Sequence, residues 1–473
     1  MRKTKIVCTL GPACAKEEVM EAMLKNGMNI ARFNFSHGTH EYHKKMIETF
    51  RRVRDRLQLP AAVMLDTKGP EIRLKDFENG KVHLKKGDRF TLTTTERMGD
   101  ASGASITFAE LPQQLHAGVR ILLDDGKVAM TVESTTETDI VCRVDDGGAL
   151  SNHKSINIPN FHIDMPYISE QDEADLIFGI EQDVDFIAAS FVRCKDDVVR
   201  LRKFLDYHGG HSIKIISKIE NIEGVNNFDE ILRHCDGIMV ARGDMGVEVA
   251  FERLPGIQKR FIRKCYQSGK MVITATQMLE SMIHSTTPTR AEITDVANAV
   301  FDGTSAVMLS GETAAGDHPA LVVKVMAQIA EQAETDAFEM ETYQGIKYES
   351  DTADVTNAIC DAAATTARDV YAKVIIAVTK SGLTARRVSK FRPPQMIVAA
   401  TPVVKTFHQL SLSWGVIPVL ALNQHNTDDL FVHAIDCAKQ IDIVSSGDKA
   451  VITAGVPLNL EGTTNLLKVQ IVN

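Results

Sequence analysis

The chain has 473 residues and a mass of 52.1 kDa, enough for about three domains, which excludes a small disulfide scaffold or a single binding module. Hydrophobic residues make up 44% and charged residues 24%, as in ordinary folded proteins and unlike disordered chains. The net charge of −9 argues against a general affinity for nucleic acid or anionic membranes. A polyanionic ligand would need a local site.

The chain shows no sign of membrane insertion or secretion. No stretch reaches the roughly 18 uninterrupted apolar residues of a membrane span, and the apolar run in residues 1–10 is too short for a signal peptide. The eight cysteines are scattered without a C-x-x-C pair, which is typical of reduced thiols inside cells. We therefore expect a cytoplasmic protein with neither a membrane nor a nucleic-acid partner.

Short β-branched segments alternate with amphipathic ones in two parts of the chain, which indicates parallel βα units. Strands are predicted at 6–10, 29–33, 62–66, 186–189, 213–217, 237–241, 271–275 and 306–309. Helices are predicted at 16–26, 41–57, 170–181, 195–208, 226–234, 251–268, 290–301 and 319–335. Eight parallel strands with crossover helices predict an α/β protein with a (β/α)8 TIM barrel rather than an open sheet.

Two other regions depart from this alternation. Between 70 and 165, apolar and polar residues alternate around Gly-Asp, Asp-Asp-Gly and Gly-Gly turns, the pattern of a small β-barrel domain. From 346 onward, helices are expected at 352–371, 385–390 and 404–410, and strands at 374–378, 396–399, 416–420, 449–454 and 467–471. The predicted domains are a barrel of 1–69 and 166–345, an inserted domain of 70–165 and an α/β domain of 346–473.

Polar side chains crowd the carboxyl ends of the predicted barrel strands, where barrel enzymes place their chemistry. Glu220 and Asp244 follow neighbouring strands, and two carboxylates without cysteine or histidine suit Mg²⁺ or Mn²⁺. Lys218 lies two residues before Glu220, so both side chains point the same way from an extended segment. The alternative is a ring of ion pairs in which Lys218 and Arg242 neutralise the two carboxylates.

Three cations, Arg32, Arg73 and Lys218, converge on the same barrel mouth and suggest a phosphorylated ligand, although each one alone is better explained by a neighbouring acid. A second group offers mostly neutral oxygens suited to a monovalent cation. Its members are Asn34, Ser36, Asp66 and Thr67. Taken alone, Ser36 is better explained as the N-cap of the helix that starts near residue 41.

Two glycine-containing loops are candidate anion sites. The segment 243–246 (Gly-Asp-Met-Gly) can present backbone N–H groups to a carboxylate or phosphate, or can be a simple turn. The segment 379–384 (Thr-Lys-Ser-Gly-Leu-Thr) follows a strand and opens a helix. Its hydroxyls, its lysine and the helix N-terminus suit one phosphate group, and a capped connection is the competing interpretation.

Taken together, these segments resemble the pyruvate kinase family over essentially the whole chain. The motifs, in family order, are ARFNFSHG, LDTKGPEIR, IISKIENIEG, MVARGDMGVE, TATQMLESM, PTRAE and VMLSGETAAG. The resemblance implies phosphoryl transfer from phosphoenolpyruvate to ADP, giving pyruvate and ATP in the last step of glycolysis. It also implies a homotetramer, a lid formed by the inserted domain and an effector site in the C-terminal domain. Because the chain ends at Asn473, we expect no extra carboxyl-terminal domain of the kind some bacterial members carry.

The resemblance also assigns roles to residues. Glu220 and Asp244 correspond to the Mg²⁺ ligands, and Lys218 to the group that stabilises the transferring phosphoryl group. The phosphoenolpyruvate contacts are Arg32, Gly243, Asp244 and Thr276; the K⁺ site is Asn34, Ser36, Asp66 and Thr67; the nucleotide contacts are Asn34, His37, Arg73 and Lys154. Glu71 is the acid that accompanies K⁺ dependence in the family.

The predicted effector loop consists of Thr379, Lys380, Ser381, Gly382 and Thr384. We find no match for the tryptophan and arginine that grip the second phosphate in fructose-bisphosphate-responsive members. A sugar monophosphate or a nucleotide monophosphate therefore fits as well as a bisphosphate.

Two other functions stay open. A Mg²⁺-dependent barrel lyase acting on a phosphoenolpyruvate-like keto acid would share the two carboxylates, but not the inserted domain or Lys218. An inactive phosphometabolite sensor would use the C-terminal loop, but we would expect it to have lost Lys218, Glu220 or Thr276. The chain retains all three.

Overall fold

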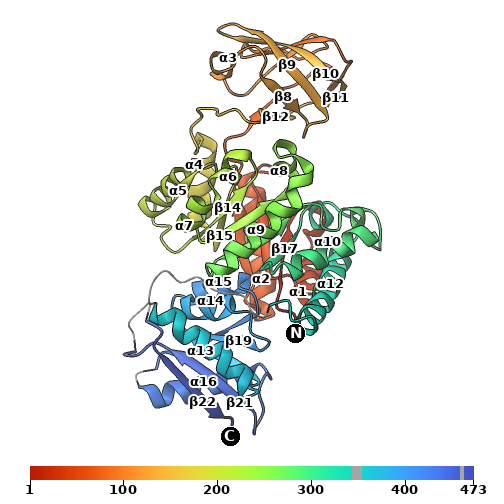
Figure 1. Cartoon of the computed structure of the whole chain (residues 1–473). Helices are drawn as coiled ribbons and strands as arrows, with labels where there is room; N and C mark the ends of the chain where they lie inside the picture. The colour runs from red at the N-terminus through yellow and green to blue at the C-terminus, as the bar shows by residue number, and fades with distance from the viewer. Residues whose placement is uncertain (344–353, 425, 459–462) are drawn as a thin grey trace.

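A computed structural model describes residues 1–343, 354–424, 426–458 and 463–473. Three bodies follow one another along the long axis of the molecule, with a β domain at one end, a barrel in the middle and an α/β domain at the other end (Figure 1). The predicted boundary at residues 345 and 346 lies outside the described residues. No helix among the described residues combines the length and the apolar character needed to cross a bilayer.

The central body is a closed eight-stranded parallel barrel, so the predicted TIM barrel is confirmed. Its strands follow the order β1-β17-β16-β15-β14-β13-β3-β2. Their bounds are β1 Lys5–Thr9, β2 Ile30–Asn34, β3 Ala62–Asp66, β13 Phe186–Ala189, β14 Lys214–Ile219, β15 Gly237–Ala241, β16 Met271–Ala275 and β17 Ala306–Leu309. These strands are almost continuously buried because side chains fill the barrel on one face and helices cover the other.

Among the described residues, eight helices surround the barrel, and three further helices directly follow strands at its carboxyl end. The surrounding helices are α1 Glu17–Lys25, α2 His40–Arg56, α4 Glu170–Glu181, α5 Lys195–Tyr207, α7 Phe228–His234, α9 Leu254–Gln267, α10 Arg290–Phe301 and α12 Pro319–Glu339. The three further helices are α6 Ile222–Asn226, α8 Arg242–Glu248 and α11 Gly311–Ala314. The N-cap of α2 is Thr39, whose side chain accepts a hydrogen bond from the Tyr42 N–H at 3.3 Å. The expectation that Ser36 caps this helix is wrong.

The inserted segment is built from short strands around one buried core, and all its paired strands are antiparallel except β6 and β7. Its elements are β4 Ile72–Arg73, β5 Lys81–Leu84, β6 Arg89–Thr93, β7 Gly103–Ser105, α3 Leu111–Gln114, β8 Arg120–Leu123, β9 Val128–Thr135, β10 Asp139–Asp146, β11 Gly148–Ser151 and β12 Ser155–Asn157. They form a seven-stranded sheet, β4-β12-β8-β9-β10-β6-β7, and a separate β11-β5 pair. The two edges of this sheet meet, because Leu74, just after β4, pairs with Ile106, just after β7. The Lys75 N–H donates to the Ser105 carbonyl at 2.8 Å and the Thr107 N–H donates to the Arg73 carbonyl at 3.0 Å, so the sheet closes into the expected β-barrel.

The C-terminal body has a five-stranded sheet in the order β20-β19-β18-β21-β22, in which only β22 is antiparallel. Its elements are α13 Val355–Asp369, β18 Val374–Val378, α14 Leu383–Lys390, β19 Met396–Thr401, α15 Val404–Gln409, β20 Val416–Leu420, α16 Thr427–Gln440, β21 Lys449–Ala454 and β22 Leu466–Ile471. The sequence prediction missed α16. This body packs on the amino ends of the barrel strands, where Lys5 Nζ donates to the Val416 carbonyl at 2.7 Å.

Candidate active site

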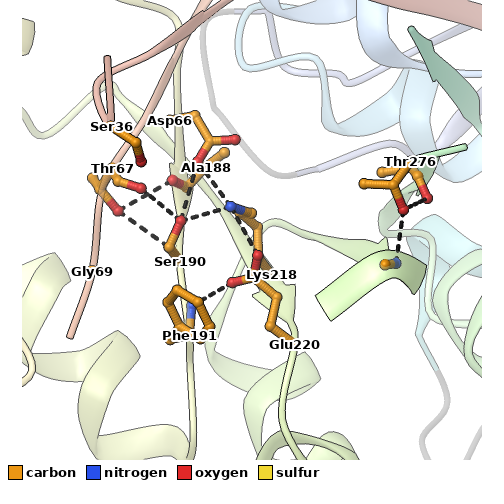
Figure 2. A network of polar contacts seen from close by, with 12 residues as sticks. Ser36, Asp66, Thr67, Gly69, Ala188, Ser190, Phe191, Lys218, Glu220 and Thr276 are labelled. Carbon is orange, nitrogen blue, oxygen red and sulfur yellow. Dashed lines mark hydrogen bonds and ion pairs between the residues drawn. The ribbon is translucent and has the colours of Figure 1, made fainter. Parts of the chain in front are cut away.

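The carboxyl ends of three barrel strands, β2, β3 and β14, bring two cations and two carboxylates together. Arg32 Nε donates to Asp66 Oδ2 at 2.6 Å. Lys218 Nζ lies 3.0 Å from Asp66 Oδ1 and 3.0 Å from Glu220 Oε1 (Figure 2). All four side chains are buried, so strands far apart in the sequence build one compact network of alternating charge.

This alternation fixes the charge of the lysine. Burial disfavours an ammonium group, but the carboxylates of Asp66 and Glu220 outweigh that effect and hold the pKa of Lys218 above its usual value. Burial likewise opposes an ionised Asp66, and the charges of Arg32 and Lys218 nevertheless hold its pKa below the usual range. Lys218 is therefore a permanent cation at the mouth of the barrel.

The pKa of Glu220 is shifted in the opposite direction from that of Asp66. Burial and the nearby charge of Asp244 raise its pKa to about 7, although Lys218 acts against the shift. The Phe191 N–H donates to Glu220 Oε2 at 2.6 Å and orients the carboxylate. A divalent cation favours the ionised form of a carboxylate beside it, and so would oppose this shift at Glu220. Glu220 and Asp244 therefore fit a metal ion better than they fit an empty site.

The donor set also indicates which metal fits. Across residues 1–343, 354–424, 426–458 and 463–473, no group of three or more histidine, cysteine, aspartate or glutamate side chains is arranged to hold a metal. Two carboxylates leave the other coordination positions to water and substrate oxygens, which is how Mg²⁺ usually binds in proteins.

Ser190 is a central member of this network that the sequence prediction missed. Its Oγ lies 2.7 Å from Lys218 Nζ and 3.1 Å from Asp66 Oδ1, and it donates to the Thr67 carbonyl at 2.6 Å. The signal was available, because Ser190 is the first residue after the predicted strand 186–189 and so belongs to a barrel strand end.

A second polar group stands where β16 ends. Thr276 and Gln277 both have positive φ, 68° and 54°, a strained conformation for a β-branched residue such as threonine. The Gly243 N–H, at the start of α8, donates to Thr276 Oγ1 at 2.9 Å. The hydroxyl of Thr276 and the N-terminus of α8 therefore meet, and segment 243–246 is part of a helix rather than a simple turn.

Arg242 supports this arrangement. It donates to the Thr276 carbonyl, and its Nη1 lies 2.7 and 2.6 Å from the two oxygens of Asp295. The alternative ring of ion pairs is therefore only half formed, since Lys218 contacts Glu220 but Arg242 pairs with Asp295.

The predicted K⁺ ligands lie together at the ends of β2 and β3. Asn34 and Asp66 are direct partners in the strand register. Asn34 Oδ1 accepts the Ser36 N–H at 3.1 Å, and Thr67 Oγ1 accepts the Ser190 N–H at 3.1 Å. Ser36, which does not cap α2, lies near Asp66 and Thr67 (Figure 2). The cluster offers neutral oxygens beside one carboxylate whose charge is shared by two cations, and such a donor set fits K⁺.

The predicted nucleotide contacts fall into two places. Arg73 lies on β4, with its Nε 2.8 Å from Glu71 and its Nη1 donating to the His153 carbonyl at 2.7 Å. Lys154 directly follows His153 in the chain, and its Nζ pairs with Asp124 at 2.8 Å. The β4–β12 ladder thus brings Arg73 and Lys154 together at the base of the inserted domain. His37 is exposed after β2.

Each of the three cations predicted at the mouth, Arg32, Arg73 and Lys218, thus has an acidic partner. The simpler interpretation, that each pairs with a neighbouring acid, is observed for every one of them. It does not exclude a phosphorylated ligand.

The predicted effector loop lines a cavity of about 820 Å³, its open mouth included. Thr379, Lys380, Ser381 and Thr384 belong to its wall. Gly382 has a φ of +78° and donates its N–H to Thr379 Oγ1 at 3.0 Å. The opposite wall includes three polar residues absent from the predicted site, His433, Thr463 and Thr464. The Thr464 hydroxyl lies 2.8 Å from that of Thr384.

Comparison with known proteins agrees with this architecture. The pyruvate kinase barrel domain family matches residues 1–323, and the pyruvate kinase alpha/beta domain family matches residues 357–470. Pyruvate kinase of Clostridium acetobutylicum is 46% identical over 473 residues, with all of both chains covered. Those of Staphylococcus haemolyticus and Geobacillus stearothermophilus are 47% and 46% identical over 474 residues, covering all of this chain and 81% of theirs. The chain belongs to the pyruvate kinase family.

Proposed function

We propose that this chain transfers the phosphoryl group of phosphoenolpyruvate to ADP and so forms pyruvate and ATP. The observation that carries the proposal is the buried, permanently charged Lys218, held 3.0 Å from Asp66 and from Glu220 at the carboxyl end of the barrel. Phosphoryl transfer requires positive charge fixed around the equatorial oxygens of the moving group. Lys218 and Arg32 supply that charge without having to move.

The cations of the family fit the residues that are present. We assign Glu220 and Asp244 to Mg²⁺ or Mn²⁺, which, when bound, neutralises charge on the phosphoryl oxygens. We assign Asn34, Ser36, Asp66 and Thr67 to K⁺. Glu71 is half-buried beside Arg73, and its acidic side chain supports K⁺ dependence.

The remaining site residues position the substrates. Gly243 and Asp244, at the start of α8, together with Thr276 and Arg32, hold phosphoenolpyruvate through N–H, hydroxyl and guanidinium groups. Asn34, His37, Arg73 and Lys154 hold the nucleotide. Because Arg73 and Lys154 sit on the strand pair that joins the inserted domain to the barrel, closure of that domain as a lid would bring nucleotide contacts in and exclude water.

The C-terminal loop is proposed as the effector site for a phosphorylated metabolite, either a sugar phosphate or a nucleotide monophosphate. The cavity beside Thr379, Lys380, Ser381 and Thr384 supports it, with Gly382 shaping the loop. We propose domain limits of 1–69 with 166–345, 70–165 and 346–473.

We also propose that the protein is a homotetramer located in the cytoplasm. Its eight free cysteines agree with a reducing compartment.

The test is pyruvate formation from phosphoenolpyruvate by the purified chain, with ADP, Mg²⁺ and K⁺ omitted one at a time. We expect turnover only when ADP and Mg²⁺ are both present, and a strong stimulation by K⁺. Pyruvate release without ADP would indicate the lyase, and no turnover with all components would indicate the sensor. Repeating the assay with fructose 1,6-bisphosphate, ribose 5-phosphate and AMP identifies the effector.

A further inference from the structure

Two connections join the inserted domain to the barrel, and both of them contact Ser190, directly after β13. On the outgoing connection, Thr67 accepts hydrogen bonds from Ser190 through its Oγ1 and its carbonyl, at 3.1 and 2.6 Å. Gly69 follows with a φ of +73°, and a Cβ built there would lie 2.9 Å from both the Cβ and the carbonyl oxygen of Ser190. On the returning connection, the Tyr167 hydroxyl donates to the Ser190 carbonyl at 3.1 Å. The two connections therefore meet at one residue of the site.

Contacts on both sides fix Tyr167 against the barrel. It is only 4% exposed and packs into the core that surrounds the barrel strands. Two residues before it, the Met165 carbonyl accepts a hydrogen bond from Arg193 Nη1 at 3.1 Å, and two residues after it, Ser169 caps α4. Burial and the charge of Asp197 raise the pKa of Tyr167 well above its usual value. Its phenol therefore keeps its proton and stays a hydrogen-bond donor.

The carbonyl that Tyr167 binds belongs to the same peptide group as the N–H of Phe191. That N–H donates to Glu220 Oε2 at 2.6 Å (Figure 2). In a trans peptide the carbonyl and the N–H point in opposite directions, so Tyr167 and Glu220 hold this group from its two ends. A hydrogen bond to the carbonyl also polarises the peptide and strengthens its N–H as a donor. The phenol thus acts on the carboxylate through one peptide group.

Phe191 would not adopt this peptide conformation by itself. Its φ is +53°, which is unfavourable for a residue with a bulky side chain. Reversing the peptide would return φ to the ordinary negative range and would turn the N–H away from Glu220. A strained conformation persists only where the surrounding contacts impose it. Here those contacts include the Tyr167 hydroxyl at one end of the peptide and the Glu220 carboxylate at the other.

We infer that Tyr167 is a positioning residue for the divalent cation. By holding the peptide between Ser190 and Phe191, it keeps the N–H directed at Glu220 and so orients the carboxylate that we assign to the metal. The inference rests on that assignment. Groups that orient a ligating carboxylate contribute to metal affinity, and here the orientation is set from the returning connection of the inserted domain. The competing explanation is that Tyr167 only fills the core and finds a partner for its hydroxyl.

The test measures metal binding directly and requires no turnover. Mn²⁺ is titrated into the purified chain, and the free ion is measured by its electron paramagnetic resonance signal. Tyr167→Phe removes only the hydroxyl, and we expect it to raise the dissociation constant of Mn²⁺ about threefold to tenfold, as for one lost hydrogen bond. In the pyruvate assay, the Mg²⁺ concentration for half-maximal rate should rise by the same factor, a larger change than any in the maximal rate.

Tyr343→Phe is the matched control. Tyr343 is also buried, and its hydroxyl donates to the Val300 carbonyl at 2.6 Å, near the end of α10 and away from the metal position. Tyr343→Phe should therefore lower the stability against denaturant about as much as Tyr167→Phe does, but leave the dissociation constant of Mn²⁺ unchanged. The pair separates the general cost of losing a buried tyrosine hydrogen bond from an effect on the metal.

An unchanged Mn²⁺ affinity in Tyr167→Phe would overturn the inference, and so would an equal weakening in Tyr343→Phe. Glu220→Gln keeps this inference apart from the proposed function. If Glu220→Gln weakens Mn²⁺ binding and Tyr167→Phe does not, the positioning role fails and the metal assignment stands. If Glu220→Gln leaves Mn²⁺ binding unchanged, the metal assignment fails, and the positioning role of Tyr167 fails with it.

Discussion

The two ends of the barrel hold their positive charge in opposite ways. At the carboxyl end, Arg32 and Lys218 each lie within 2.6 or 3.0 Å of a buried carboxylate. At the amino end, Lys5 is also buried, but its Nζ donates to the backbone carbonyl of Val416 at 2.7 Å. There Arg392 lies over the ring of Trp414, 4.5 Å from its centroid.

This difference sets how constant the charge is at each end. Carboxylate neighbours keep the pKa of Lys218 above its usual value, so its positive charge is fixed over the neutral range. Burial, together with the like charge of Arg2, lowers the pKa of Lys5 to about 7. The carboxyl end of the barrel therefore carries a preorganised charge, whereas the charge of Lys5 at the amino end changes with pH.

The largest effect is expected at Lys218. Lys218→Met should lower turnover by about 10³- to 10⁵-fold, because a single fixed cation beside a transferring phosphoryl group can accelerate the reaction by that factor. Mg²⁺ and phosphoenolpyruvate affinity should change little. Lys214→Met, on the same strand and paired with Asp236 at 3.1 Å, is the matched control and should keep turnover near wild type. Lost binding with intact turnover in Lys218→Met would contradict the assigned role.

The next effect concerns the carboxylate shared by both cations. Asp66→Asn leaves two buried cations short of their common partner, so the free energy of unfolding should fall by about 3–5 kcal/mol, as measured by denaturant titration. Asp183→Asn removes an exposed partner of Lys405 and should cost no more than about 1 kcal/mol. Equal losses of unfolding free energy in the two variants would show that Asp66 stabilises the protein no more than an exposed ion-pair partner does.

A smaller effect is expected at the metal position. Glu220→Gln keeps the shape of the side chain but removes one ligand charge, so the Mg²⁺ concentration for half-maximal rate should rise by about tenfold to a hundredfold. Glu223→Gln, three residues further along the chain and paired with His162 at 2.9 Å, should leave it unchanged. An unaltered Mg²⁺ requirement in Glu220→Gln would remove Glu220 from the metal site.

The last prediction concerns Lys5, at the amino end of the barrel, and the pH dependence of stability. The pKa of Lys5 falls from 10.5 to about 7 on folding, so between these values the unfolded chain binds the extra proton. The free energy of unfolding should therefore rise with pH across this interval, by up to about 1.4 kcal/mol per pH unit. Lys5→Met should show a shallower rise in denaturant titrations between pH 7 and 10. Identical slopes for the two proteins would contradict a neutral, buried Lys5.

Much of the barrel could be predicted because its signals are local. All eight predicted strands coincide with observed strands to within two residues at either end, since each buried strand is a short apolar run bounded by turn residues. The helix α16 was missed although Leu430, Ala434 and Ala438 follow a helical spacing and Asn426 caps it. The inserted domain was correctly expected to be a β-barrel, but the pairs that close it, such as Leu74 with Ile106, carry no local sequence signal.

The sequence was enough to predict which residues belong to the site, but not which of their side chains contact one another. Glu220 and Lys218 were found because they follow one strand at a spacing of two, which keeps them on one side. The role of Ser190 depends on β13 lying between β3 and β14, and the partner of Arg242 is Asp295, 53 residues away. Such choices of partner are made by the folded barrel and carry no local sequence signal.

The most direct test of the proposed activity is the amount of ATP formed for each pyruvate released by the purified chain with phosphoenolpyruvate, ADP, Mg²⁺ and K⁺. We predict one ATP for each pyruvate in the wild-type protein, with both products falling together in Lys218→Met. Pyruvate released without an equal amount of ATP would contradict phosphoryl transfer to ADP as the function of this barrel.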